Sequence, residues 1–169
     1  MTERIPVLGL FETHLTVSDL QRSIGFYHDI IGLQLALYVF ERNAAFFWIG
    51  DDSRRSMLGL WSLGKTPVGL TLHVAFEVAK MEDLLKTPKW LKAHGITPLS
   101  FYGIESEEPS VIGWMPAAAI YFRDPDGHLI EYLTMLKEKE PRHDIGVIGW
   151  SEWLSLGRDR LQQDQQNNN

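Results

Sequence analysis

The chain has 169 residues, 44% of them hydrophobic, and a formal net charge of −6 at pH 7. This length suffices for one domain, or for two small fused modules, with a proper core. Lys and Arg are scattered without a basic stripe, which argues against nucleic acid as a partner. We expect no membrane partner, because no apolar run reaches spanning length and the first residues are unlike a signal peptide. The lack of cysteine fits a reducing, cytoplasmic location and excludes thiolate metal ligands.

The first half of the chain predicts a strand, a helix and three further strands. The first strand covers Leu10–Val17, and Ser18 is the expected helix N-cap, with Gln21 completing a capping box. The helix that follows has one apolar face at helical spacing and ends before Gly32. The three extended runs are Leu33–Phe40, Ala45–Ile49 and Met57–Leu63.

The same order of elements then starts again. A strand over Leu70–Val78 precedes a helix over Lys80–His94, which Pro88 is expected to break or restart behind Thr87. A long loop, Tyr102–Pro116, is typical of a functional lid. The three strands of this half are predicted at Ile96–Phe101, Ala118–Arg123 and Leu129–Met135, with a tight Asp124-Pro125-Asp126-Gly127 turn joining the last two.

This repeat divides the chain into four parts that together make one structural domain. The two modules cover residues 1–65 and 66–137, and a C-terminal extension covers 138–161. In the extension, Pro141–Gly149 is expected to be irregular, and Ser151–Leu156 to form a short amphipathic helix. Residues 162–169 are almost all Gln and Asn, a composition that predicts disorder.

Three ionisable side chains lie inside predicted strands. His14 and His73 are each on the first strand of a half, and Glu131 is on the last strand of the second half. Because side chains alternate along a strand, the face opposite each histidine is apolar and can pack against the helices. A single strand histidine is usually structural, but two at matched repeat positions, together with a glutamate, favour a metal site.

Other residues are candidates for the walls of a small-molecule pocket. When the strand Met57–Leu63 is aligned with the strand of Glu131, Gly59 takes the position that corresponds to Glu131. Met57 and Trp61 lie on the same strand face as Gly59. Two aromatic candidates come from the long loop. His128, just after the turn, is expected to face solvent. The candidate pocket residues are Thr16, Met57, Trp61, Tyr102 and Trp114.

The chain resembles the vicinal oxygen chelate superfamily, which includes glyoxalase I, extradiol dioxygenases, fosfomycin-modifying transferases and bleomycin-resistance proteins. The resemblance is carried by three stretches: His14–Val17 with Asp19 and the Ser23–Tyr27 helix, His73–Phe76, and Tyr121–His128 with Glu131. It implies an α+β fold in which two βαβββ modules form a curved mixed sheet around a cleft. It also implies one divalent metal ion, Fe, Mn, Ni or Zn, with His14, His73 and Glu131 as its ligands.

The chain departs from the glyoxalase I pattern at one ligand. Glyoxalase I usually has a fourth ligand, a glutamate, where this chain has Gly59. In glyoxalase I the carboxylates also move the substrate proton, so a general base is needed here from elsewhere. Glu77, on the strand face of His73, is a weak catalytic candidate, and Glu131 is a second.

The expected activity is that of a glyoxalase-type lyase or isomerase acting on a small molecule with adjacent oxygens. Two imidazoles and one carboxylate leave coordination positions open for such a substrate. An extradiol ring-cleaving dioxygenase is one alternative, and a metal-free drug-binding resistance protein is another. A fosfomycin-type transferase fits Thr16, although the long loop lacks the expected basic and small polar residues. We expect a homodimer, with the cleft built within one chain or across two.

Overall fold

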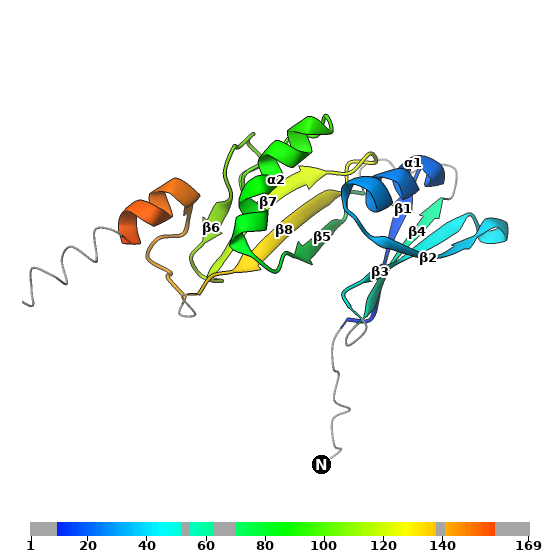
Figure 1. Cartoon of the computed structure of the whole chain (residues 1–169), viewed down its shortest axis with the longest axis horizontal. Coiled ribbons are helices and arrows are strands. Elements are labelled where there is room, and N and C mark those ends of the chain that lie inside the picture. The colour runs from blue at the N-terminus through cyan, green and yellow to red at the C-terminus, as the bar shows by residue number, and fades with distance from the viewer. Residues whose placement is uncertain (1–9, 52–54, 63–69, 138–140, 158–169) are drawn as a thin grey trace, which may run out of the picture. The chain divides into compact units, whose positions relative to one another are not determined.

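The computed structural model describes residues 10–51, 55–62, 70–137 and 141–157 (Figure 1). The chain divides into two compact units. The first runs to Leu72 and also includes Asp124–Gly127; the second comprises His73–Arg123 and the chain from His128 onward. Each unit has a mixed β-sheet of its own, so the expected α+β class and paired modules are confirmed. Among the described residues, no helix has the length and apolar character needed to cross a bilayer.

The first unit is a four-stranded sheet with one helical segment. Its strand order is β1-β4-β3-β2, with β1 parallel to β4 and the remaining pairs antiparallel. Apolar side chains of β1 and β4, among them Leu15 and Leu58, are fully buried, and α1 packs against β3 and β4. The elements are β1 (Glu12–Val17), α1 (Leu20–Gly25), a π-helical turn (Phe26–Ile30), β2 (Gln34–Val39), a 3-10 turn (Phe40–Arg42), β3 (Ala44–Ile49) and β4 (Ser56–Ser62).

The N-cap of α1 is Asp19, not the predicted Ser18. The Asp19 carboxylate accepts a hydrogen bond from the backbone N–H of Arg22 at 3.0 Å. Ser18 is engaged elsewhere, because its N–H and its hydroxyl both donate to Asp126. A distant partner therefore shifts the start of the helix by one residue.

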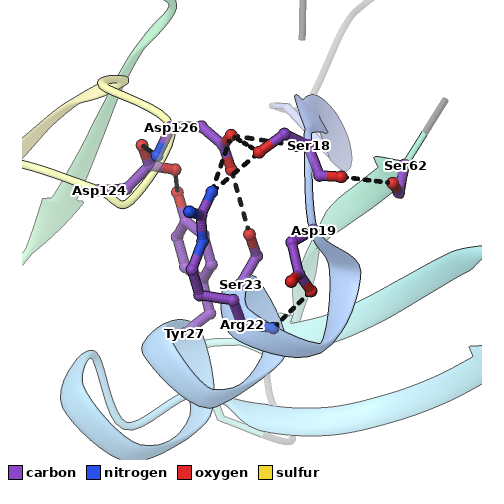
Figure 2. A network of polar contacts seen from close by, with 8 residues as sticks. All are labelled: Ser18, Asp19, Arg22, Ser23, Tyr27, Ser62, Asp124 and Asp126. Carbon is purple, nitrogen blue, oxygen red and sulfur yellow. Dashed lines mark hydrogen bonds and ion pairs between the residues drawn. The ribbon is translucent and has the colours of Figure 1, made fainter. Parts of the chain in front are cut away.

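Asp126 is the centre of a polar network that joins the predicted tight turn to α1 (Figure 2). One of its carboxylate oxygens also accepts from Arg22 Nη2 at 3.1 Å, and the other accepts from the Ser23 hydroxyl at 3.3 Å. The buried Tyr27 hydroxyl donates to the neighbouring Asp124 at 3.0 Å. Burial and the Asp124 charge raise the pKa of Tyr27, so the phenol stays a neutral donor.

The turn itself has the predicted geometry. Gly127 has φ of 87°, a value that favours glycine, and its N–H donates to the Asp124 carbonyl at 3.0 Å. The Asp126 N–H donates to the Asp124 carboxylate at 3.0 Å. The turn thus belongs to the first unit, although the strands that it joins belong to the second.

The second unit is a five-stranded sheet in the order β5-β8-β7-β6-β9, with β5 parallel to β8 and the remaining pairs antiparallel. Figure 1 shows α2 along β7 and β8, which it contacts. A second helical segment covers residues 150–157, in agreement with the predicted C-terminal helix. The other elements are β5 (His73–Glu77), α2 (Met81–Ala93), β6 (Ser110–Ile112), β7 (Ala117–Arg123), β8 (Leu129–Met135) and β9 (Val147–Gly149).

Four predictions in this unit are wrong. Pro88 does not break α2: Thr87 and Pro88 are both buried, and the Thr87 hydroxyl donates to the Asp83 carbonyl. Ile96–Phe101 is not a strand, since only Leu99 forms isolated bridges there. In place of that strand the sheet has β6, which lies inside the predicted loop. β6 pairs with β9, which lies in the segment that was expected to be irregular. Such short strands form because a neighbouring strand pairs with them, and their own sequence does not predict them. The predicted disordered tail, 162–169, lies outside the described residues.

Both faces of the five-stranded sheet bury apolar side chains. The face covered by α2 holds Leu84 against Val111, Ala118 and Ile120. The opposite face buries Ala119 and Tyr121 with Leu99, Leu129 and Leu133 packed against them. Since Glu131 lies between Leu129 and Leu133 on β8, it belongs to this second face, away from α2.

Candidate functional site

His73 and Glu131 are in direct contact in the second unit. The parallel pairing of β5 and β8 places Glu131 opposite Ala75. His73 Nε2 lies 3.0 Å from Glu131 Oε2. The glutamate is only 5% exposed, whereas the histidine side chain is 48% exposed. The pair is therefore a buried carboxylate beneath an imidazole that solvent and small molecules can reach.

Tyr121 holds the other oxygen of that carboxylate, and sequence reasoning missed it. The Tyr121 hydroxyl donates to Glu131 Oε1 at 3.0 Å. Burial, and then the adjacent Glu131 charge, raise the pKa of Tyr121, which keeps the phenol a neutral donor. The signal was local: in the hairpin of β7 and β8, Tyr121 lies directly opposite Glu131.

The two aromatic candidates from the long loop connect to this pair through Phe101. The Phe101 ring centroid lies 6.1 Å from that of Tyr121, 5.7 Å from that of Trp114 and 5.4 Å from that of Tyr102. Tyr102 and Trp114 are both exposed. Phe101 itself was hidden from sequence reasoning because it ends the predicted but absent strand.

His14 and three of the predicted pocket residues lie together in the first unit. The His14 ring centroid is 5.7 Å from that of Trp61. Thr16 is the register partner of Trp61, and Met57 is the register partner of Glu12. His14 Nε2 lies 3.0 Å from Glu12 Oε1, a contact that sequence reasoning did not identify.

His14 and His73 do not occupy equivalent positions in the two modules. Glu12 begins β1 and His73 begins β5. Glu12 precedes the N-cap Asp19 by as many positions as His73 precedes the N-cap Lys80. The strand counterpart of His73 is therefore Glu12, which corrects the sequence-based matching of the two histidines.

The spacing from the N-caps also matches His14 with Ala75. The register partner of His14 is Gly59, and the register partner of Ala75 is Glu131. Gly59 therefore corresponds to Glu131, in agreement with the predicted alignment.

Two other predicted residues lie apart from the pairs. Glu77 is exposed and is opposite Leu133, further along β8 than Glu131. His128 is 1% exposed and so is buried, against the expectation that it faces solvent, because it enters the sheet directly after the turn. A hollow of about 480 Å³ lies near the start of α2 and the C-terminal helix, and none of the predicted site residues lines it.

The donor atoms of the second unit fit a metal ion. Their 3.0 Å separation is less than twice a typical metal–ligand bond of about 2.1 Å, so one cation can contact both. An imidazole with a carboxylate suits Fe, Mn, Ni or Zn. Across residues 10–51, 55–62, 70–137 and 141–157, no group of three or more His, Cys, Asp or Glu side chains gathers around one point.

Comparison with known proteins identifies the family. The sequence model of the family described as "Glyoxalase/Bleomycin resistance protein/Dioxygenase superfamily" matches residues 9–132, so the chain belongs to this superfamily. A probable lactoylglutathione lyase of Vibrio parahaemolyticus is 28% identical, over 73% of this chain and 88% of that protein. Glutathione transferase FosA of Serratia marcescens is 32% identical, over 70% of this chain and 76% of that protein. An integron cassette protein from the mobile metagenome of the Halifax Harbour sewage outfall has a similar structure, with a TM-score of 0.61, 27% identity and coverage of 76% and 100%.

Proposed function

We propose that the protein is a metal-dependent enzyme of the glyoxalase type that acts on a small molecule with adjacent oxygens. His73 and Glu131 would be metal ligands, and His14 is the proposed ligand from the first module. The observation that carries the proposal is the contact of His73 with Glu131 at 3.0 Å. The Tyr121 hydroxyl holds Oε1, and Oε2 and the exposed imidazole nitrogen are close enough to share one cation.

The residues around this pair have distinct tasks. A bound divalent metal would supply a Lewis acid that stabilises negative charge on substrate oxygens. Tyr121 orients Glu131 by holding Oε1, which leaves Oε2 directed at His73. The rings of Phe101 and Trp114 would provide an apolar wall beside Tyr121.

The family similarity supports more than one reaction. The lyase proposal is supported by the relatives named lactoylglutathione lyase. The FosA relative, at 32% identity, supports a thiol transferase as a second candidate, although the sequence ranks that activity low. An extradiol dioxygenase and a metal-free drug binder are further alternatives, which the assays below separate.

Metal analysis tests the proposal directly. Full-length protein is purified, stripped with a chelator and titrated calorimetrically with Zn²⁺, Ni²⁺, Mn²⁺ and, without oxygen, Fe²⁺. We expect one ion per chain for at least one metal, and losses of affinity of about tenfold or more in His73→Ala and Glu131→Gln. His28→Ala removes an exposed histidine of the first unit and is the matched control. Wild-type affinity in His73→Ala would refute metal dependence and leave the drug binder.

Activity assays then separate the reactions. The metal-loaded protein is given the hemithioacetal of methylglyoxal and glutathione, fosfomycin with a thiol, or a catechol with oxygen uptake recorded. We expect turnover of the hemithioacetal, and turnover of only one of the others would replace the lyase proposal with that activity. We also propose a cytoplasmic homodimer, which light scattering on the purified protein and fractionation of cells would test.

A further inference from the structure

In each module the first strand takes part in an imidazole–carboxylate pair, and the two pairs have the same separation between donor atoms. In the second module His73 Nε2 is 3.0 Å from Glu131 Oε2, and in the first module His14 Nε2 is 3.0 Å from Glu12 Oε1. The pairs are built differently. The first lies along one strand, β1, while the second bridges two neighbouring strands, β5 and β8.

Gly59 makes room for the pair of the first module. A Cβ atom added at Gly59 would lie 2.5 Å from His14 Cδ2 and 2.9 Å from His14 Nε2. The imidazole therefore fills the space that a side chain at position 59 would enter. Gly59 is the counterpart of Glu131, so the last strand of the first module has no carboxylate at this position. The His14 ring lies in the space that such a side chain would take.

The His14 ring is held from several sides. Phe46 lies at 6.0 Å and Trp61 at 5.7 Å between ring centroids, and Glu12 contacts its Nε2. Phe46 is opposite Gly59 in the same way that Tyr121 is opposite Glu131. The Glu12 side chain is 34% exposed and that of His14 is 46% exposed, so both can be reached by a cation from solvent.

We propose that Glu12 acts with His14 as the metal-donor pair of the first module, and that Gly59 is needed to seat this pair. The carboxylate that the last strand of this module lacks is supplied by Glu12 on the first strand. The chain then carries two imidazoles and two carboxylates as metal donors. This inference rests on the proposed metal-dependent function and adds Glu12 to its ligands.

The test compares single variants of the full-length, chelator-stripped protein by calorimetric titration with Zn²⁺ and Ni²⁺. Glu12→Gln keeps the size and hydrogen-bonding capacity of the side chain and removes its charge. We expect it to lower metal affinity by about tenfold or more, as His14→Ala does. Glu41→Gln, an exposed carboxylate of the same unit, is the matched control and should bind like the wild type.

Gly59→Ala provides an independent second variant. Its Cβ would displace the His14 ring, so we expect a similar loss of affinity although no donor atom has been removed. Circular dichroism checks that each variant is folded. If Glu12→Gln and Gly59→Ala bind both metals like the wild type while His73→Ala does not, the inference is wrong and the proposed function stands. If His73→Ala binds normally, the proposed function and the inference fail together.

Discussion

The two modules have the same strand order and different polar residues. In both, the first strand is parallel to the last and the middle pairs are antiparallel. Yet the position of His73 is taken by Glu12, and that of Glu131 by Gly59. A repeated backbone therefore does not repeat the roles of its side chains. The histidines of the two modules, His14 and His73, lie at different positions of their strands.

The modules also differ in how deeply they bury their carboxylates. Glu131 is buried and held by the Tyr121 hydroxyl, whereas Glu12 is part-exposed and the counterpart of Tyr121 is Phe46, which has no hydroxyl. A buried carboxylate needs a donor to offset its lost hydration, and an exposed one does not.

Asp126→Ala should destabilise the first unit most. The change leaves the Ser18 N–H, the Arg22 guanidinium and the Ser23 hydroxyl without this acceptor, which should cost about 3 kcal/mol of unfolding free energy. Urea unfolding followed by tryptophan fluorescence measures it. Asp29→Ala, an exposed carboxylate of the same unit, is the control, and an equal effect of the two changes would show that the network of Figure 2 adds no stability.

Tyr121→Phe makes the second module resemble the first. Loss of the hydroxyl leaves Glu131 Oε1 without this donor, so metal affinity should fall about tenfold, or about 1.4 kcal/mol. Calorimetric titration with Zn²⁺ measures the change. Tyr102→Phe removes an exposed hydroxyl from the same unit and should leave affinity unchanged. Equal metal affinities of the wild type, Tyr121→Phe and Tyr102→Phe would mean that Tyr121 does not orient Glu131.

Glu108→Ala tests a feature of the second unit that the first lacks, its C-terminal helix. The Glu108 carboxylate accepts from the Ser151 N–H and from the Ser151 hydroxyl, each at 2.9 Å, in the first turn of residues 150–157. Its loss should cost about 1 kcal/mol, as for other helix caps, measured by thermal unfolding. Glu107→Ala removes an exposed partner of Lys92 and should have little effect. Equal melting temperatures for the two variants would argue against a capping role.

The smallest effect at neutral pH concerns three tyrosines, one in the first unit and two in the second. Burial is the main cause that raises the pKa of Tyr27, of Tyr121 and of Tyr132, the last to about 12. Because the folded-state values lie above the ordinary value of about 10, these groups cost no stability below pH 10 and destabilise the fold as pH rises beyond it. Absorbance at 295 nm should show them ionising only with unfolding. Ionisation of all five tyrosines near pH 10 in folded protein would contradict this.

The sequence alone predicted the local features of this protein. The alternation of β7 and β8 and the Asp124–Gly127 turn place Glu131 in a hairpin, and such a turn sets its own register. Most strands follow from the periodicity of apolar residues, and so do the helical segments at residues 20–30 and 81–93. The superfamily followed from the motifs around His14, His73 and the turn, and the family comparison confirms it.

Only the tertiary structure decided the features that depend on distant partners. The pairing of β1 with β4 joins segments far apart in the chain, and no local pattern sets that register, so the close approach of His14 to Gly59 became visible only in three dimensions. The same holds for β9, which exists because β6 offers it a free edge, and for the N-cap of α1, which moved because Asp126 binds Ser18. Hydrogen-bonding groups take the partner that folding brings near, and local sequence cannot specify which partner that is.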